Sequence, residues 1–302
     1  MLLTRRKIHG RLLLSGLLAA SAAAHAQSVI RNDESLGSNR PETWAMSYVA
    51  ASTLMTGFGL TPALPPGQWT ASFDLGHIPR LGESQQRVGF AGTKQEDLNR
   101  SPVFGRARFA VGLPGGLVAE LGYTPPTEIS NTSARNLFSV ALGRRLYENG
   151  RLGITARIFR QHGSASGDIT CPAALADAPA ASNPYGCRAA SNDRIGLRYY
   201  GVDATAGWNP GEWNLHATAG MVRADLSVQV DALTVDVRDR SYLSARPSWP
   251  FATLGASHDL DARWNLGAEV LYVPLRVQRE LSGPRRTEAL TSLRLRLLYR
   301  FS

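Results

Sequence analysis

Two cysteines, Cys171 and Cys187, have the spacing of a small disulfide-bonded loop. The 302-residue chain has no other cysteine. An exported protein meets an oxidising compartment, in which such a pair forms a bridge. Closing a loop of about 15 residues removes roughly 3 kcal/mol of unfolded-chain entropy. No histidine or cysteine lies between them, so a metal site would lack ligands. We predict a Cys171–Cys187 disulfide and no metal.

Arginines and carboxylates that share one parity form the second group with chemical potential. Within stretches of alternating sequence, the residues of this parity are Asp74, Arg106, Arg108, Glu120, Arg157, Asp203, Glu269, Arg294, Arg296 and Arg300. If these stretches are strands of a narrow barrel, the charges face a poorly hydrated lumen and should pair with one another. We predict a structural network of lumen ion pairs, with an arginine-lined path or an anion site as the alternative.

Histidines could supply acid or base chemistry, and those beyond the N-terminal leader are His77, His162, His216 and His258. His77 and His162 fall near the same predicted rim, but strands far apart in order need not bring them together. His258 precedes Asp259 in a predicted turn, with no nucleophile placed beside it. No glycine-rich loop has the spacing of a phosphate-binding P-loop. We therefore name no catalytic residue and expect no cofactor.

The first 26 residues have the order of a cleavable secretory signal. A basic stretch ends at Arg11, an apolar stretch runs from Leu12 to Ala24, and Ala24-His25-Ala26 is a cleavage motif before Gln27. The apolar stretch is too short to span a membrane as a helix. Without the leader's four basic residues the formal net charge falls from +9 to +5. Arginine supplies nearly all of the remaining basic charge, and nucleic-acid binding is not expected.

Residues 68–302 contain about ten segments in which apolar and polar residues alternate, a pattern typical of strands. The segments are approximately 68–78, 102–113, 117–124, 137–146, 151–162, 195–208, 213–226, 245–258, 264–277 and 289–301. The alternation is clearest near the C-terminus, where Leu293, Leu295 and Leu297 have one parity and Arg294 and Arg296 the other. No segment after the leader has 18 consecutive apolar residues, which argues against an α-helical membrane protein.

The connections between these segments alternate in length. Short connections at 114–116, 147–150, 209–212 and 259–263 contain Pro-Gly, Asn-Gly or Asp, which favour tight turns. Long polar connections occupy 79–101, 125–136, 163–194, 227–244 and 278–288. Short turns on one rim and long loops on the other are typical of outer-membrane barrels, in which the short turns are periplasmic.

Tryptophans mark the predicted strand ends beside the short turns. Those at the short-turn ends are Trp69, Trp208, Trp213 and Trp264. Trp69 shares its parity with Ala71 and Phe73, and Trp213 shares its parity with Leu215. Because amphipathic aromatic residues gather at membrane–water boundaries, the four tryptophans predict an interfacial aromatic belt at the periplasmic rim.

Residues 27–67 precede the alternating segments, and the stretch from Trp44 to Trp69 contains no charged residue. Trp44, Tyr48 and Met55 follow helical spacing, and Pro41 is a suitable first helical residue. The stretch is too short and too rich in serine and threonine for a spanning helix. We expect either a plug in the lumen or a helical or irregular segment at the periplasmic rim.

Residues 68–302 resemble the general class of Gram-negative outer-membrane β-barrel proteins, in architecture and not in one specific family. The last strand ends in Tyr299-Arg300-Phe301, one place before Ser302, similar to the terminal aromatic signature of that class. The resemblance implies an outer-membrane location and contact with membrane lipids and lipopolysaccharide. It also implies recognition of the last strand by the barrel-assembly machinery.

The sequence thus predicts an all-β protein, a closed antiparallel transmembrane β-barrel of about ten strands with a short N-terminal helical or irregular segment. Such a protein would act as a small, porin-like restricted channel or as a structural or surface-interaction protein. One alternative is a surface hydrolase, omptin-like or lipid-acting, with its site on the external loops. A second alternative is a soluble periplasmic β-protein.

Overall fold

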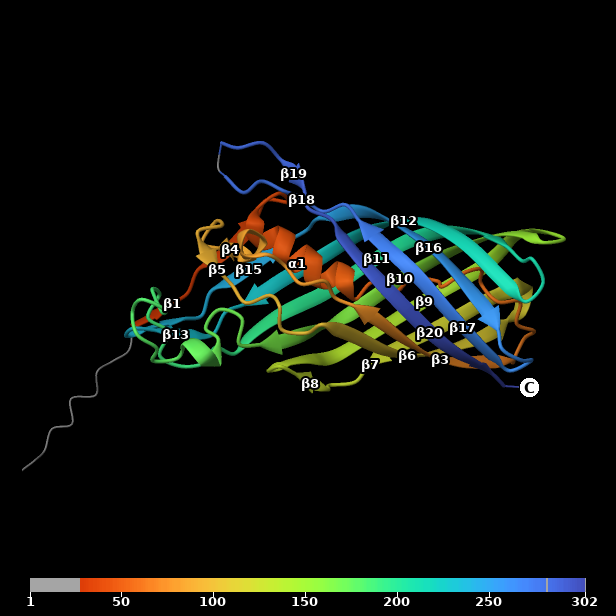
Figure 1. The fold of residues 1–302 in the computed structure, drawn as a ribbon, viewed down its shortest axis with the longest axis horizontal. Coiled ribbons are helices and arrows are strands. Elements are labelled where there is room, and N and C mark those ends of the chain that lie inside the picture. Colours follow the sequence, from red (N-terminus) through yellow and green to blue (C-terminus); the bar gives the residue numbers. More distant parts are fainter. Residues whose placement is uncertain (1–27, 281, 302) are drawn as a thin grey trace, which may run out of the picture.

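A closed antiparallel barrel forms the body of the protein in the computed structural model, which describes residues 28–280 and 282–301 (Figure 1). Its ten strands are β3 (Trp69–His77), β6 (Val103–Leu113), β7 (Leu117–Thr124), β9 (Thr132–Asn149), β10 (Leu152–Gly167), β11 (Asp193–Trp208), β12 (Trp213–Gln229), β16 (Ser248–Asp259), β17 (Trp264–Val273) and β20 (Leu290–Arg300). Each strand pairs with the next in this order, and β20 pairs with β3 to close the barrel. The predicted fold is therefore confirmed, whereas the predicted signal at 1–26 lies outside the described residues.

Period-two alternation decides which side chains line the lumen. On β20, Leu293, Leu295 and Leu297 are exposed on the outer face, while Arg294 and Arg296 are buried inside. Asp74 on β3 lies in register with Arg296 on one neighbouring strand and with Arg106 on the other. Since successive side chains of a strand point to opposite faces, the charges of one parity meet inside the barrel.

The strands β9, β10, β11 and β12 run farther toward the loop rim than the alternation predicts, and β10 continues to Gly167. The residues that these strands add at the loop end are mostly small or polar, so no hydrophobic alternation marks their ends. Two predicted segments are instead too long. Strand β16 begins after Pro247 and β17 ends before Pro274. Proline has no N–H to donate to a ladder, which favours strand ends at these positions.

The long connections form a structured cap over one end of the barrel. Its short elements are β4 (Arg87–Gly89), β5 (Lys94–Gln95), β8 (Glu128–Ile129), β13 (Ala232–Thr234), β14 (Val237–Asp239), β15 (Tyr242–Ala245), β18 (Arg276–Val277), β19 (Arg286–Thr287), α2 (Glu83–Gln86) and the 3-10 turn Ala173–Leu175. The N-terminal strands β1 (Ser28–Ile30) and β2 (Asp33–Leu36) join this cap by parallel pairing with β14 and β15. The described chain therefore begins at the loop end.

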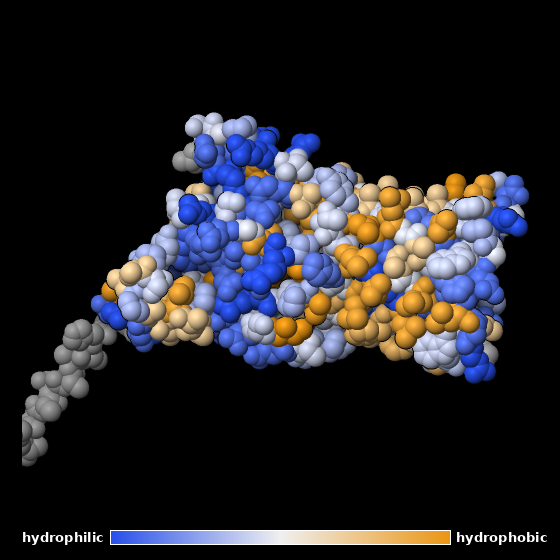
Figure 2. Space-filling model, viewed as in Figure 1, coloured by the Kyte–Doolittle hydropathy of each residue, from blue (hydrophilic) through white to orange (hydrophobic). Residues whose placement is uncertain are grey.

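Figure 2 shows apolar side chains on the half of the barrel nearer the short turns and hydrophilic ones on the loop half; the exposed apolar side chains continue around the barrel as a belt. All ten barrel strands contribute large exposed apolar side chains to this belt, among them Phe73, Phe109, Leu121, Phe138, Ile158, Val202, Met221, Leu254, Val270 and Leu295. Lipid satisfies such a surface and water does not, provided that the backbone is paired within a closed barrel. Within the described residues, no helix is long and apolar enough to cross a membrane.

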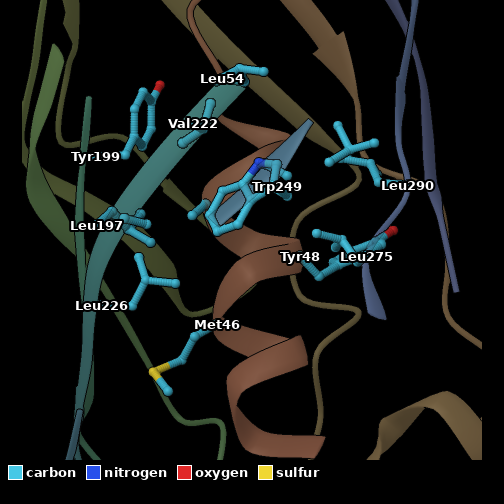
Figure 3. Packing of buried hydrophobic residues seen from close by; sticks show 14 of the residues in the cluster. Met46, Tyr48, Leu54, Leu197, Tyr199, Val222, Leu226, Trp249, Leu275 and Leu290 are labelled. Carbon is cyan, nitrogen blue, oxygen red and sulfur yellow. The ribbon is translucent and has the colours of Figure 1, made fainter. Parts of the chain in front are cut away.

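Helix α1 (Pro41–Ser52) lies inside the loop end of the barrel, against β11, β12 and β20. It begins at Pro41, as the sequence predicts, and it is buried on nearly all sides. Figure 3 shows its Met46 and Tyr48 among Leu197, Leu226 and Trp249 of the strands. This apolar cluster fills the loop half of the lumen.

Candidate functional site in the barrel lumen

The chain that follows α1 runs through the lumen toward the short-turn rim before it enters β3. At the loop end, the α1 side chain of Tyr48 donates a hydrogen bond to the carbonyl of Pro79. Farther along, Leu60 packs near Gly153 and Gly207, whose missing side chains leave room for it. At the short-turn end, the amide of Gly67 donates to the carbonyl of Gly112. We call residues 41–64 the lumen segment.

Five inward arginines donate hydrogen bonds to the backbone of the lumen segment. Arg294 binds the carbonyls of residues 51, 52 and 54, and Arg106 binds that of residue 53 at 2.7 Å. Arg157, Arg108 and Arg296 bind those of residues 55, 56 and 57 at 3.0, 2.8 and 2.8 Å, respectively. Every carbonyl from residue 51 to residue 57 thus accepts a hydrogen bond from an arginine. The barrel contacts the backbone of this segment irrespective of its side chains.

The same arginines form ion pairs with inward carboxylates. Asp74 lies 2.9 Å from Arg108 and 2.8 Å from Arg296. Glu120 bridges Arg108 and Arg157, and the Arg157 guanidinium lies 2.8 Å from Asp203. These side chains are at most 10% exposed, so each charge depends on its partners for the solvation that water no longer provides.

The C-terminal end of α1 offsets an imbalance of charge in this network. Five arginines (106, 108, 157, 294, 296) face four carboxylates (74, 120, 203, 269). Arg294 and Arg106 lie against the last carbonyls of α1, where the helix dipole is negative. Backbone carbonyls and the helix end thus stabilise arginines that the carboxylates leave incompletely paired.

Glu269 has a different environment from the other three lumen carboxylates. It accepts a hydrogen bond from the hydroxyl of Thr56 in the lumen segment. The Nε2 atom of His216 lies 3.7 Å from its second oxygen, and both side chains are fully buried. Among residues 28–280 and 282–301, no other histidine lies within 4 Å of a carboxylate. Because the pair is fully buried, an external substrate has no access to it.

Arg300 is the one residue of the predicted network that the structure places elsewhere. Its guanidinium lies 2.6 Å from Asp259 at the short-turn rim, and both side chains are partly exposed. The other nine predicted residues lie in the lumen. Trp69, Trp208, Trp213 and Trp264 are 39 to 50% exposed at the same rim, and Trp69 stacks on Phe301 with ring centroids 3.6 Å apart.

A cavity of about 470 Å³ with a mixed polar and apolar lining opens at the short-turn rim. Residues 57–64 of the lumen segment form part of its wall, together with Arg145, Arg157 and Asn214. Arg145 donates to the carbonyl of Thr61 at 3.1 Å. None of the residues that line this cavity belongs to α1, which fills the opposite half of the barrel.

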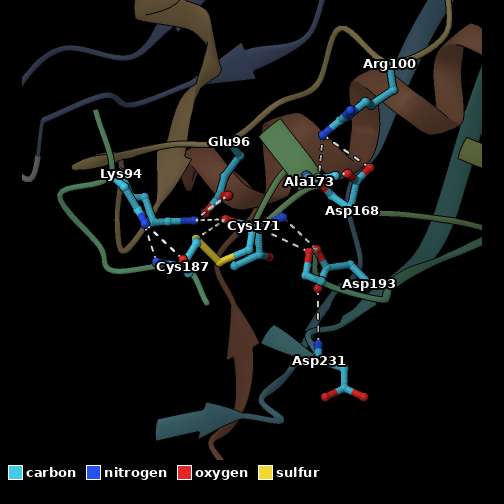
Figure 4. Close-up of a disulfide and its surroundings, with 12 residues drawn as sticks. Lys94, Glu96, Arg100, Asp168, Cys171, Ala173, Cys187, Asp193 and Asp231 are labelled. Atoms are coloured by element: carbon cyan, nitrogen blue, oxygen red, sulfur yellow. Dashed lines mark hydrogen bonds and ion pairs between the residues drawn. A yellow bond between two sulfur atoms is a disulfide. The ribbon is translucent and has the colours of Figure 1, made fainter. Parts of the chain in front are cut away.

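The predicted disulfide Cys171–Cys187 is present and lies in the cap (Figure 4). Lys94 lies beside it, donating at 2.6 Å to the carbonyl of Thr170 and at 2.7 Å to Glu96. Burial raises the pKa of Glu96 to about 7, although the Lys94 charge opposes this shift. The hydrogen bond from Lys94 to Thr170 fastens the first long connection to the third, and the disulfide closes a loop within the third.

His77 and His162 lie on β3 and β10, with β6, β7 and β9 between these strands. Both side chains are exposed on the outside of the barrel. The structure therefore does not bring together the two histidines that could have served a hydrolase of the external loops.

Sequence reasoning did not identify the lumen segment as the partner of the arginines. The signal was present in two places. The stretch from Trp44 to Trp69 carries no charge, and glycine occurs at inward positions such as 143, 153 and 207. An inward glycine makes room for something inside the barrel, as Gly143 does for Thr61.

No protein-family model matches the chain, and no curated protein matches its sequence. Solved structures with a similar fold include Ail, the attachment invasion locus protein of Yersinia pestis, at 10% identity and a TM-score of 0.33 over 78% of this chain and 100% of that one. The outer-membrane protease OmpT of Escherichia coli matches at 11% identity and 0.32, over 78% and 94%. The toluene transporter TodX of Pseudomonas putida matches at 10% and 0.31, over 90% and 99%.

At these identities and TM-scores the matches do not indicate what the chain does. A closed ten-stranded barrel with an outward apolar belt and aromatic residues at the short-turn rim has the architecture of an outer-membrane β-barrel.

Proposed function

We propose that this protein is a closed outer-membrane barrel whose lumen segment acts as a resident plug and whose cap presents a rigid surface outside the cell. It reaches the outer membrane by way of the predicted signal at 1–26, and the barrel-assembly machinery recognises its last strand. Of the two functions that the sequence predicts, a structural or surface-interaction role fits the geometry better than a restricted channel.

The observation that carries this proposal is the unbroken series of hydrogen bonds from arginines to carbonyls 51–57. A channel needs a hydrated path, and here the plug occupies the middle of the lumen while α1 and its apolar cluster occupy the loop half. The space that remains for water is the cavity at the short-turn rim. Ions that enter this cavity meet a packed interior, not a pore.

The barrel would conduct as a restricted channel only after the plug leaves the lumen. The arginines would then exchange backbone carbonyls for water, and an excess of one positive charge would favour anions. Opening would also expose the apolar side chains of α1, such as Trp44 and Met46, which are about 1% exposed in the closed barrel. Their burial stabilises the closed state, at roughly 1.5 to 3 kcal/mol for each large apolar side chain.

The proposal is tested by solute entry into liposomes that contain the purified protein. We expect the intact protein to admit no small sugars or amino acids, and a variant that lacks residues 28–64 to admit them. A variant that lacks only residues 28–36 keeps the plug and serves as the control. Swelling of liposomes with the intact protein, at the rate of the plug-deleted variant, would overturn the proposed closed state.

A further inference from the structure

Three exposed arginines form a compact group on the outer wall of the barrel at the loop side of the apolar belt. Arg160 on β10 and Arg223 on β12 lie in register with Tyr200 on β11, one on each side of it. Arg198 lies two residues farther along β11 toward the loops, on the same face. We call Arg160, Arg198, Arg223 and Tyr200 the outer basic patch.

The arginines of the patch have no partner that accounts for their position. In the part of the chain that the structure describes, the side chains of Arg160, Arg198 and Arg223 form no hydrogen bond or ion pair. The one acidic side chain nearby is Asp225, opposite Arg198, and its carboxylate lies 3.9 Å from Arg246. With Arg246 included, four cations face a single anion. This contrasts with the lumen, where each of the carboxylates 74, 120, 203 and 269 has at least one arginine or histidine partner.

The height of the patch places it at the level of lipid headgroups. Ile158, Val202 and Met221 lie two residues nearer the short turns on the same faces and are half exposed within the apolar belt. From Trp208 to Tyr200 the strand rises about 26 Å along its axis, or about 20 Å along the membrane normal at a tilt of about 40°. This height approaches the apolar thickness of an outer-membrane barrel. Arg160 and Arg223, in register with Tyr200, therefore lie at the outer edge of the apolar belt, and Arg198, two residues farther along, lies at the level of the headgroups.

The patch is confined to one side of the barrel. On the opposite wall, β3 and β20 carry His77 and Thr291 at their outward loop ends, and β17 carries Tyr272. A general excess of positive charge would be spread around the circumference. A group limited to three adjacent strands matches a ligand with several phosphates held a fixed distance apart.

We propose that the outer basic patch binds the phosphorylated headgroup of an outer-leaflet glycolipid, the lipid A moiety of lipopolysaccharide. Neighbouring strands are about 5 Å apart, so Arg160 and Arg223 lie about 10 Å apart with Tyr200 between them. Guanidinium groups bind phosphate oxygens in pairs, while the acyl chains pack on Ile158, Val202 and Met221. Tyr200, which is 57% exposed, lies at the boundary between the two. This inference rests on the outer-membrane location in the proposed function, but not on a closed lumen.

The test is titration of the purified full-length protein in detergent with diphosphoryl lipid A, followed by native mass spectrometry. Replacing Arg160, Arg198 and Arg223 by Gln should weaken binding roughly 100-fold, from the contribution that each basic residue makes near an anionic lipid surface. The matched control replaces three exposed arginines near the short turns, Arg144, Arg151 and Arg263, by Gln and should bind as the intact protein does.

A second comparison does not depend on how the triple variant folds. The intact protein should bind diphosphoryl lipid A more tightly than monophosphoryl lipid A of the same acylation. Equal binding of the two lipids, or unchanged binding by the triple variant, would overturn the proposal. Conduction by the intact protein would contradict the closed lumen and leave this result unaffected, so the two failures are distinguishable.

Discussion

Replacing Asp74 by Ala removes the carboxylate that lies between Arg108 and Arg296. The residue is 7% exposed, and its carboxylate oxygens lie within 3.3 Å of both guanidinium groups. After the change Arg108 keeps Glu120, but Arg296 keeps only the carbonyl of Gly57 and the ring of Phe58. A buried charge left without its counter-ion costs about 3 to 5 kcal/mol. We expect a loss near the lower end of this range because Arg108 remains paired.

The assay is denaturant unfolding of the refolded barrel, followed by tryptophan fluorescence. Asp259→Ala is the matched control, because Asp259 pairs with Arg300 at the rim where both side chains are partly exposed. An exposed pair of this kind contributes less than about 1 kcal/mol. Equal losses in the two variants would refute the buried network. So would a change of ion selectivity in Asp74→Ala with unchanged stability, the expected behaviour of charges that line a hydrated path.

Three further predictions concern the cap and the topology. Cys171 and Cys187 should resist thiol labelling until reductant is added, and reduction should lower stability by about 3 kcal/mol; labelling of the untreated protein would contradict the bridge. The pKa of Glu96 is raised to about 7 from an ordinary 4.5. Between these two pH values the folded cap keeps a proton that the unfolded chain has lost. The contribution of this carboxyl to stability therefore falls as the pH rises from about 4.5 to about 7. Hydrogen exchange in the cap should therefore be faster at pH 8 than at pH 5, and Glu96→Gln should remove the part of that difference that exceeds intrinsic exchange; an unaltered difference would exclude Glu96 as its source. Epitope tags before Ser28 and within 163–194 should be reached by antibody on intact cells, whereas a tag at Asn149 should not; the reverse pattern would invert the orientation.

Much of the barrel could be predicted from the sequence because a membrane imposes a simple rule on each strand. Outward residues such as Leu293 and Leu295 face lipid and inward residues such as Arg294 face the lumen, so the parity of a side chain predicts its environment. Where the strands leave the lipid the rule ends. The loop-side extension of β10 to Gly167 carries no such signal, since its residues are glycine, serine and alanine.

The path of the N-terminal segment could not be predicted in the same way. Its helical spacing predicts α1 from Pro41, but a plug and a rim helix have the same local sequence requirements. What distinguishes them is the tertiary arrangement of arginines such as Arg106 and Arg294, whose hydrogen bonds to the backbone leave no pattern in the side chains that they contact. Arg300 shows the converse limit, because its parity matches that of Arg296 while its height places it at the rim.

Single-channel recording of the purified, full-length protein in planar bilayers tests the closed lumen most directly. The proposed arrangement predicts no resolved conductance steps from the intact protein and stable steps from the variant that lacks residues 28–64. Stable, voltage-independent conductance of the intact protein, equal to that of the deletion variant, would contradict a plug held in place by Arg106, Arg157 and Arg294.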